Sequence, residues 1–99
     1  MTIQEVNNGG NLQLDVEGKI DSLTCQDFQD TILKTFQRTN NLVINMEKVD
    51  YVSSAGLRAL ILGQKTASSK GGSMVVINAS ASVKDVFRVT GFDKVLDIR

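Results

Sequence analysis

A strand followed closely by a helix that opens on two adjacent serines is the feature that most restricts how this chain folds. Leu42–Met46 is a short apolar run with β-branched residues in its middle, which predicts a central strand buried on both faces. The stretch Asp50–Leu62 then turns through small and polar residues and begins an apolar helix, predicted over about Ser54–Ala67. A buried strand leading into a helix favours a β-α unit in an α/β fold.

Ser53 and Ser54 lie at the predicted start of this helix. The first N–H groups of a helix have no intrahelical partner and carry the positive end of the macrodipole. A hydroxyl there can cap the helix, and a phosphate there can be held. Local chemistry alone favours capping as the role of Ser54, because many helices begin with serine. The alternative is that its hydroxyl accepts a phosphate.

The remaining pattern predicts a hairpin followed by further β-α units. Asn7–Gly10 favours a tight reversal between two antiparallel strands. Leu12, Leu14 and Val16 alternate with polar residues, so the second of these strands is wet on one face. The other predicted elements are an amphipathic helix over Cys25–Phe36, a buried strand over Met74–Asn78, a helix capped by Ser80 or Ser82 and ended by Gly91, and a short last strand over Val95–Ile98.

This order of elements predicts an α/β fold in one domain that spans residues 1–99. Alternating strands and helices favour right-handed crossovers and parallel pairing after the hairpin. We therefore expect a mixed sheet of four to five strands with helices mainly on one face. The chain has 99 residues, 41% of them hydrophobic, which is enough to enclose one core of ordinary size.

Composition argues against several classes of function. Eleven basic residues balance eleven acidic ones, so no net charge attracts DNA, RNA or an anionic membrane. Histidine is absent, which removes Ser-His and Cys-His catalytic pairs and His-based metal sites. Gly71 and Gly72 precede a strand instead of a helix, unlike a phosphate-binding loop. We expect no enzymatic activity, no metal and no cofactor, although weak nucleotide binding stays open.

Cys25 is the only cysteine, which rules out an intrachain disulfide and a cysteine-rich zinc site. An unpaired thiol fits a reducing compartment, and we expect Cys25 to be a small core residue. Met1–Glu5 lacks the basic start and the apolar block of a signal peptide, and no apolar run is long enough to span a bilayer. The sequence therefore predicts a cytoplasmic location.

Three segments make the sequence resemble the STAS domains of anti-sigma factor antagonists, the bacterial anti-anti-sigma factors. The best-known signature of that family is Asp-Ser-Ser-Gly-Leu at the start of the second main helix, and Ser53–Leu57 aligns with it. Gly18–Asp21 is similar to the family's Gly-x-Leu/Ile-Asp segment before the first helix, and Gly91–Phe92 is similar to its Gly-Leu/Phe after the third. The resemblance covers essentially the whole chain.

The resemblance implies that Ser54 is the phosphoacceptor of a partner switch. The unphosphorylated protein would bind an anti-sigma factor that is also a serine kinase, and so release a sigma factor. Phosphorylation would end the binding, and a serine phosphatase would restore it. Ser53 stands where the signature has Asp, and Ala55 where it has the second Ser, so Ser53 is the alternative acceptor. We expect a monomer when the protein is free.

The predicted partner-binding residues are Asp21, Ser53, Ser54, Gly56 and Arg58. Some of them have plainer explanations. Asp21, Ser22 and Thr24 can each cap the first helix. Gly56 could serve the close packing of two elements instead of the access of a partner, and Arg58 could be a solvated charge. A rival function is a STAS module that is never phosphorylated and acts as a scaffold in a transport or signalling complex.

Overall fold

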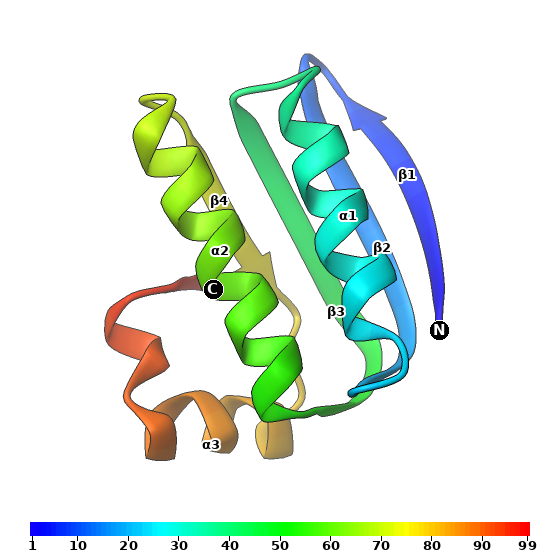
Figure 1. Ribbon diagram of the computed structural model, residues 1–99, viewed down its shortest axis with the longest axis vertical. Helices are drawn as coiled ribbons and strands as arrows, with labels where there is room; N and C mark the ends of the chain where they lie inside the picture. The colour runs from blue at the N-terminus through cyan, green and yellow to red at the C-terminus, as the bar shows by residue number, and fades with distance from the viewer.

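The computed structural model describes residues 1–99 as a sheet with its helices on one face (Figure 1). The elements in chain order are β1 Thr2–Asn8, β2 Asn11–Ile20, α1 Cys25–Phe36, β3 Asn41–Val52, α2 Ser54–Ser69, β4 Ser73–Ile77, α3 Ala81–Thr90, the 3₁₀ turn η1 Phe92–Lys94 and β5 Asp97–Ile98. The predicted α/β fold is confirmed. No helix is long and apolar enough to cross a membrane.

The five strands lie in the sheet in the same order as in the chain. β1 and β2 pair antiparallel, and every later neighbour pairs parallel. Gly9 and Gly10, both with positive φ, form the tight reversal predicted between β1 and β2. Each later strand extends the sheet at the same edge, and right-handed crossovers therefore place successive helices on one face. Figure 1 shows α1 and α2 side by side over the sheet, with α3 near one end of it.

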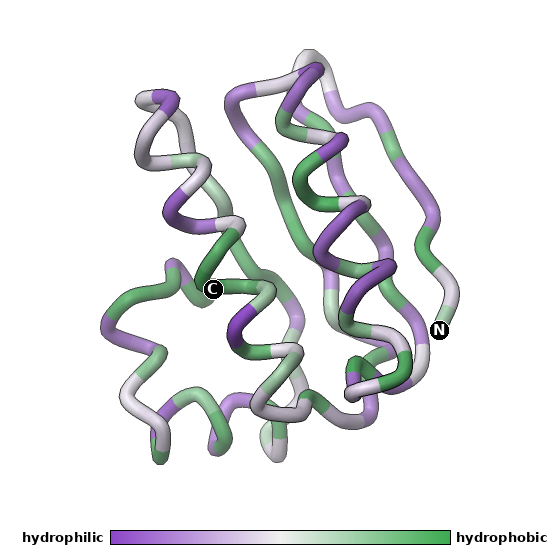
Figure 2. Tube along the Cα trace, viewed as in Figure 1, coloured by the Kyte–Doolittle hydropathy of each residue, from purple (hydrophilic) through white to green (hydrophobic).

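The core is one cluster of 22 buried apolar residues between the sheet and these helices. Leu12, Leu14 and Val16 of β2 are buried, while the residues between them are half-exposed, as the alternating pattern predicted. The predicted stripe of α1 is buried at Phe28, Ile32 and Phe36. Figure 2 shows the corresponding alternation of hydrophobic and hydrophilic residues along α1.

Two expectations about β3 are wrong. The strand is central but buried on one face only, because the helices cover one side and leave Val43 and Asn45 half-buried on the other. It also continues to Val52, well past Met46. The second half of β3 lacks the regular alternation of apolar and polar residues that marks a strand, because the pairing of β3 with β2 shifts register twice.

The uncovered face of the sheet carries a row of hydrogen-bonded polar side chains. The Asp15 carboxylate accepts from Gln13 Nε2 at 2.7 Å and from Asn45 Nδ2 at 3.0 Å. Asn78 Nδ2 donates to Asn45 Oδ1 at 3.1 Å. These bonds join β2, β3 and the end of β4, and they satisfy polar groups that the sheet partly removes from water.

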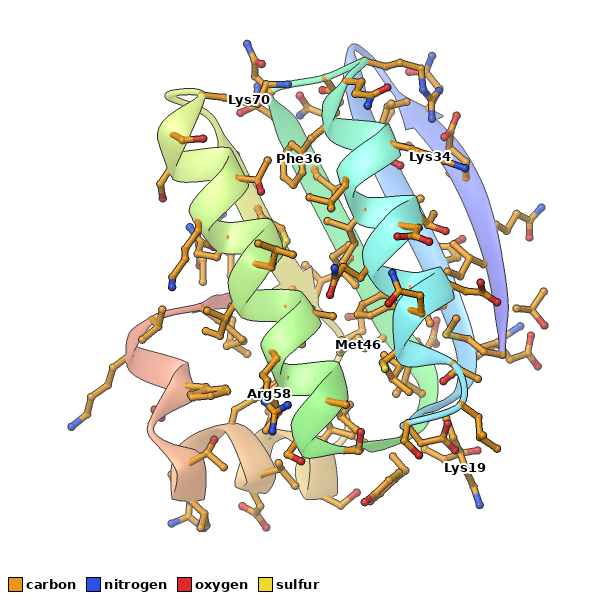
Figure 3. The ribbon with its side chains drawn as sticks, in the orientation of Figure 1. Lys19, Lys34, Phe36, Met46, Arg58 and Lys70 are labelled. Carbon is orange, nitrogen blue, oxygen red and sulfur yellow. The ribbon has the colours of Figure 1, made fainter.

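Two contacts hold the far end of α1. Lys70 Nζ donates to the carbonyl oxygens of Phe36 and Thr39 and lies 5.8 Å from the centre of the Phe36 ring. Figure 3 shows Lys70 and Phe36 near the same end of the helix pair. Arg38 forms an exposed, two-bonded ion pair with Glu5 of β1. Hydrogen bonding to Arg38 lowers the pKa of the Glu5 carboxyl below its ordinary value. The end of α1 is thereby attached to both α2 and the edge strand.

Candidate functional site

The loops that follow β2 and β3 meet at one edge of the sheet. Ile20, which ends β2, pairs with Val52, which ends β3. The strands are parallel, so both chains leave the sheet on the same side. The Ser53 amide donates to the Ile20 carbonyl at 2.8 Å and joins the two loops directly. We call residues Ser53–Gly56, where α2 begins, the serine turn.

Within the serine turn, the two serines have different positions and different contacts. Ser53 has extended backbone, and its Oγ accepts from the Gly56 amide at 3.2 Å, so it is the N-cap of α2. Ser54 is the first helical residue; it is exposed, and its hydroxyl makes no hydrogen bond. Capping by Ser54, the plain explanation from sequence, is therefore wrong. The bond to Ile20 holds Ser53 at the position a cap requires.

Asp21 organises the neighbouring loop. Its Oδ1 accepts from the amides of Leu23 at 3.0 Å and Thr24 at 3.2 Å, and its carbonyl accepts from the amide of Cys25, the first residue of α1, at 2.8 Å. The N-cap position of α1 is Thr24, and no side chain makes a capping bond there, so the expected cap by the side chain of Asp21, Ser22 or Thr24 is wrong. The Asp21 side chain instead holds the loop that precedes the helix. The carboxylate is half-buried next to the serine turn.

Gly56 is buried beneath the serine turn, where it lies against the end of β2. A Cβ at this position would stand 2.7 Å from Ile20 Cγ2 and 3.0 Å from both the Ile20 carbonyl oxygen and Val52 Cγ1. Close packing of two elements, one of the two explanations open from sequence, accounts for the glycine. Gly56 therefore positions the exposed serine without presenting a side chain of its own.

Arg58 is exposed and lies one helical turn beyond Ser54, on the same side of α2. Figure 3 shows its side chain on the flank of α2 that faces the C-terminal segment. The three ion pairs of the molecule are made by the other three arginines, so the Arg58 charge has no carboxylate partner. The solvated charge expected as the plain explanation matches this placement.

Two large exposed side chains near the serine turn were missed from the sequence. Leu23, in the Asp21 loop, is 89% exposed, and Tyr51, two residues before Ser53, is 50% exposed. Tyr51 pairs with Lys19 across β2 and β3. Leucine and tyrosine are usually assigned to a core, yet Leu23 falls outside the three-and-four spacing of the α1 stripe, which was the available signal.

This edge of the sheet contains no cluster of three or more His, Cys, Asp or Glu side chains that could hold a metal ion. Cys25, expected in the core, is half-buried instead, with its Sγ 3.7 Å from the Ser22 carbonyl oxygen. It starts α1 at the rim of the sheet, where the helix has not yet covered it. The Ser54 hydroxyl at this edge is exposed and makes no hydrogen bond.

Comparison with known proteins adds a family to this geometry. A family model described as the STAS domain matches residues 2–99. The anti-sigma-B factor antagonist of Bacillus subtilis strain 168 is 25% identical over 91 residues, covering 92% of this chain and 84% of that protein.

Two solved structures show the same fold. An anti-sigma factor antagonist from Mycobacterium paratuberculosis has a TM-score of 0.87 and 22% identity, covering 98% of this chain and 83% of that one. The phosphorylated Bacillus cell fate determinant SpoIIAA has a TM-score of 0.75 and 16% identity, covering 99% and 91%.

Replacing each serine by alanine should separate their structural roles. Ser53→Ala removes the cap and should lower the free energy of unfolding by about 1 kcal/mol. Ser54→Ala removes a hydroxyl without a partner and should change it by less than about 0.5 kcal/mol. Urea unfolding of both variants measures the difference. Equal losses would mean that the two serines share the cap.

Gly56→Ala should disturb the serine turn through overpacking. The new Cβ meets the Ile20 backbone, and such overpacking costs about 1–3 kcal/mol of unfolding free energy. Gly63→Ala is the control, because its Cβ also overpacks the core, against Met74 Sδ at 2.8 Å and Ile32 Cγ2 at 2.9 Å, but seven residues further along α2. Amide shifts of Ser53 and Ser54 should change in the first variant alone. Unchanged shifts in Gly56→Ala would contradict this role.

Proposed function

Since the chain belongs to the STAS domain family, we propose that it acts as an anti-sigma factor antagonist in a partner switch. The unphosphorylated protein binds an anti-sigma factor that is also a serine kinase, and a sigma factor is released. Phosphorylation of Ser54 ends the binding, and a serine phosphatase restores it. The relative in Bacillus subtilis, an anti-sigma-B factor antagonist, supports this proposal.

The observation that carries the proposal is the exposed hydroxyl of Ser54 at the start of a helix whose cap is supplied by Ser53. A kinase can reach this hydroxyl, and its modification breaks no hydrogen bond of the fold. The phosphate adds about −1.5 to −2 charges where the helix dipole favours an anion. The modified protein therefore stays folded while the charge of its surface changes.

Docking uses the surface around the serine turn. The side chains of Leu23 and Tyr51, three residues after Ile20 and two before Ser53, supply exposed contact area, and tyrosine is common among the residues that dominate binding energies. Asp21 and Ser54 contribute polar groups from the same two loops. A phosphate in the middle of such a contact would lose much of its hydration when the partner docks, and this cost favours release.

Ser54 should carry the phosphate in cells where the kinase is active. Peptide mass spectrometry of the protein isolated from its own cells should map the modification to Ser54. Ser54→Ala should abolish it, because the acceptor oxygen is removed. Ser53→Ala should still carry the phosphate, because the Ser53 hydroxyl caps α2 and is not the proposed acceptor.

Other outcomes would replace the proposal. Phosphate that persists in Ser54→Ala and disappears in Ser53→Ala would identify Ser53 as the acceptor. If no phosphate appears while the kinase phosphorylates a control substrate, a constitutive STAS scaffold in a transport or signalling complex becomes the better function. The triplet Ser53–Ala55, which departs from the Asp-Ser-Ser of the signature, favours that second candidate.

Removing the exposed anchors should weaken partner binding with little loss of stability. Leu23→Ala deletes a side chain that is almost wholly in water and should change the free energy of unfolding by less than about 0.5 kcal/mol. Tyr51→Ala deletes a side chain that is half in water and should cost about 1 kcal/mol. Affinity for the anti-sigma factor should fall about fivefold or more. Val89→Ala, which trims an exposed residue of α3, is the control. Calorimetry showing equal affinities for all three would exclude this docking surface.

A further inference from the structure

A shallow apolar groove runs between α2 and the C-terminal segment, beside the serine turn. Its lining residues are Arg58, Ile61, Leu62, Lys65, Phe92 and Val95. Val95 is 53% exposed, and the side chains of Ile61, Leu62 and Phe92 are only partly covered. The helix thus leaves apolar area in water on the flank to which Arg58 points (Figure 3).

The charge of this groove is entirely positive. Arg58 and Lys65 border it, neither forms an ion pair, and no carboxylate lines it. α2 contains no aspartate or glutamate at all. Arg38, Arg88 and Arg99, in contrast, each have a carboxylate partner. Both cations are therefore free to pair with acidic groups of an occupant.

The spacing along α2 indicates the shape of that occupant. Arg58, Ile61, Leu62 and Lys65 follow one another at intervals of three, one and three residues, which places them on one side of the helix over two turns. An apolar groove bordered along one side by a helix face of this kind can accept the apolar side of an amphipathic helix. A second copy packed groove to groove would bring like charges together, which disfavours it.

We infer that the groove binds an amphipathic helix of the partner, with apolar residues on its inner side and Asp or Glu flanking them. This inference rests on the proposed function, because the helix belongs to the partner bound at the serine turn. Ile61, Leu62, Phe92 and Val95 contact its apolar side, and Arg58 and Lys65 pair with its carboxylates. The groove extends the docking surface along α2 from the serine turn.

Arg58 connects this groove to the switch. Ser54 and Arg58 are four residues apart in one helix, so their Cβ atoms are about 5–6 Å apart. A phosphate on Ser54 lies within reach of the Arg58 guanidinium, which forms strong two-bonded pairs with phosphate. The phosphoserine then pairs with the Arg58 guanidinium, which is no longer free to pair with a carboxylate of the acidic helix. Release follows from competition within the chain as well as from repulsion.

A selection from random peptides tests this inference before the partner is identified. A phage library of helix-forming peptides, randomised over 16 residues, the length of α2, is selected on the unphosphorylated protein. Binding peptides should be enriched in Asp and Glu beside apolar residues at intervals of three and four. The peptide most strongly enriched is then labelled, and its affinity is measured by fluorescence anisotropy.

Charge reversal identifies the binding site of that peptide. The double variant Arg58→Glu with Lys65→Glu should bind about tenfold more weakly or worse, since two attractions become repulsions. Lys34→Glu with Lys48→Glu makes the same change of net charge at positions outside the groove and should bind as the original protein does. Circular dichroism verifies that both variants are folded.

Phosphoserine incorporated at position 54 tests the competition. Phosphoserine should weaken binding of the peptide about as much as the loss of one ion pair, and the weakening should be smaller in an Arg58→Ala background, where only the repulsion remains. The inference is overturned if the selected peptides lack acidic enrichment, or if they bind the groove variant and the control variant equally. It is also overturned if phosphoserine weakens binding equally with and without Arg58.

The two proposals fail separately. If Ser54 carries no phosphate in cells, the partner switch is contradicted, while binding of acidic peptides in the groove is not affected. If the selected peptides bind outside the groove, the groove proposal is contradicted, while phosphorylation of Ser54 is not affected.

Discussion

The contact between the end of β2 and the start of α2 is the constraint on which the site depends. The Ile20 carbonyl accepts from the Ser53 amide at 2.8 Å, and α2 packs so closely on Ile20 that position 56 has no room for a side chain. This contact fixes the backbone of the serine turn, assigns the cap to Ser53 and leaves the hydroxyl of Ser54 in water. The same strand end leads into the loop that Asp21 organises.

The surface that results combines three kinds of group. Apolar side chains that stay in water lie next to the Ser53–Ile20 junction, a modifiable hydroxyl stands at the helix start, and an unpaired arginine lies one turn further along α2. None of these groups is needed by the core, whose 22 buried residues lie between the sheet and the helices. A surface of this kind can change its affinity for a partner through a local change of charge, because the folded scaffold beneath it stays the same.

Much of the fold could be predicted from the sequence, because local patterns decide most of it. The glycine pair of the hairpin, the stripe of α1 and the order of strands and helices led to the observed topology. The extent of β3 could not be predicted, since its pairing past Met46 depends on shifts of register against β2. The choice of cap could not be predicted either. Ser53 and Ser54 are chemically alike, and a carbonyl from a distant strand decides between them. Leu23, Tyr51 and the groove depend on packing that periodicity does not report.

The different roles of Ser53 and Ser54 also affect the rate at which the protein is degraded in a cell. Degradation follows the fraction of molecules that is unfolded, and small losses of stability reduce abundance several-fold. A modification that removed the cap of α2 would therefore change the amount of protein whenever it changed its binding. The cap belongs to Ser53 and the exposed hydroxyl to Ser54. A modification of Ser54 would accordingly leave the cap of α2 in place, so the modification itself would not raise the fraction of unfolded protein that is open to degradation.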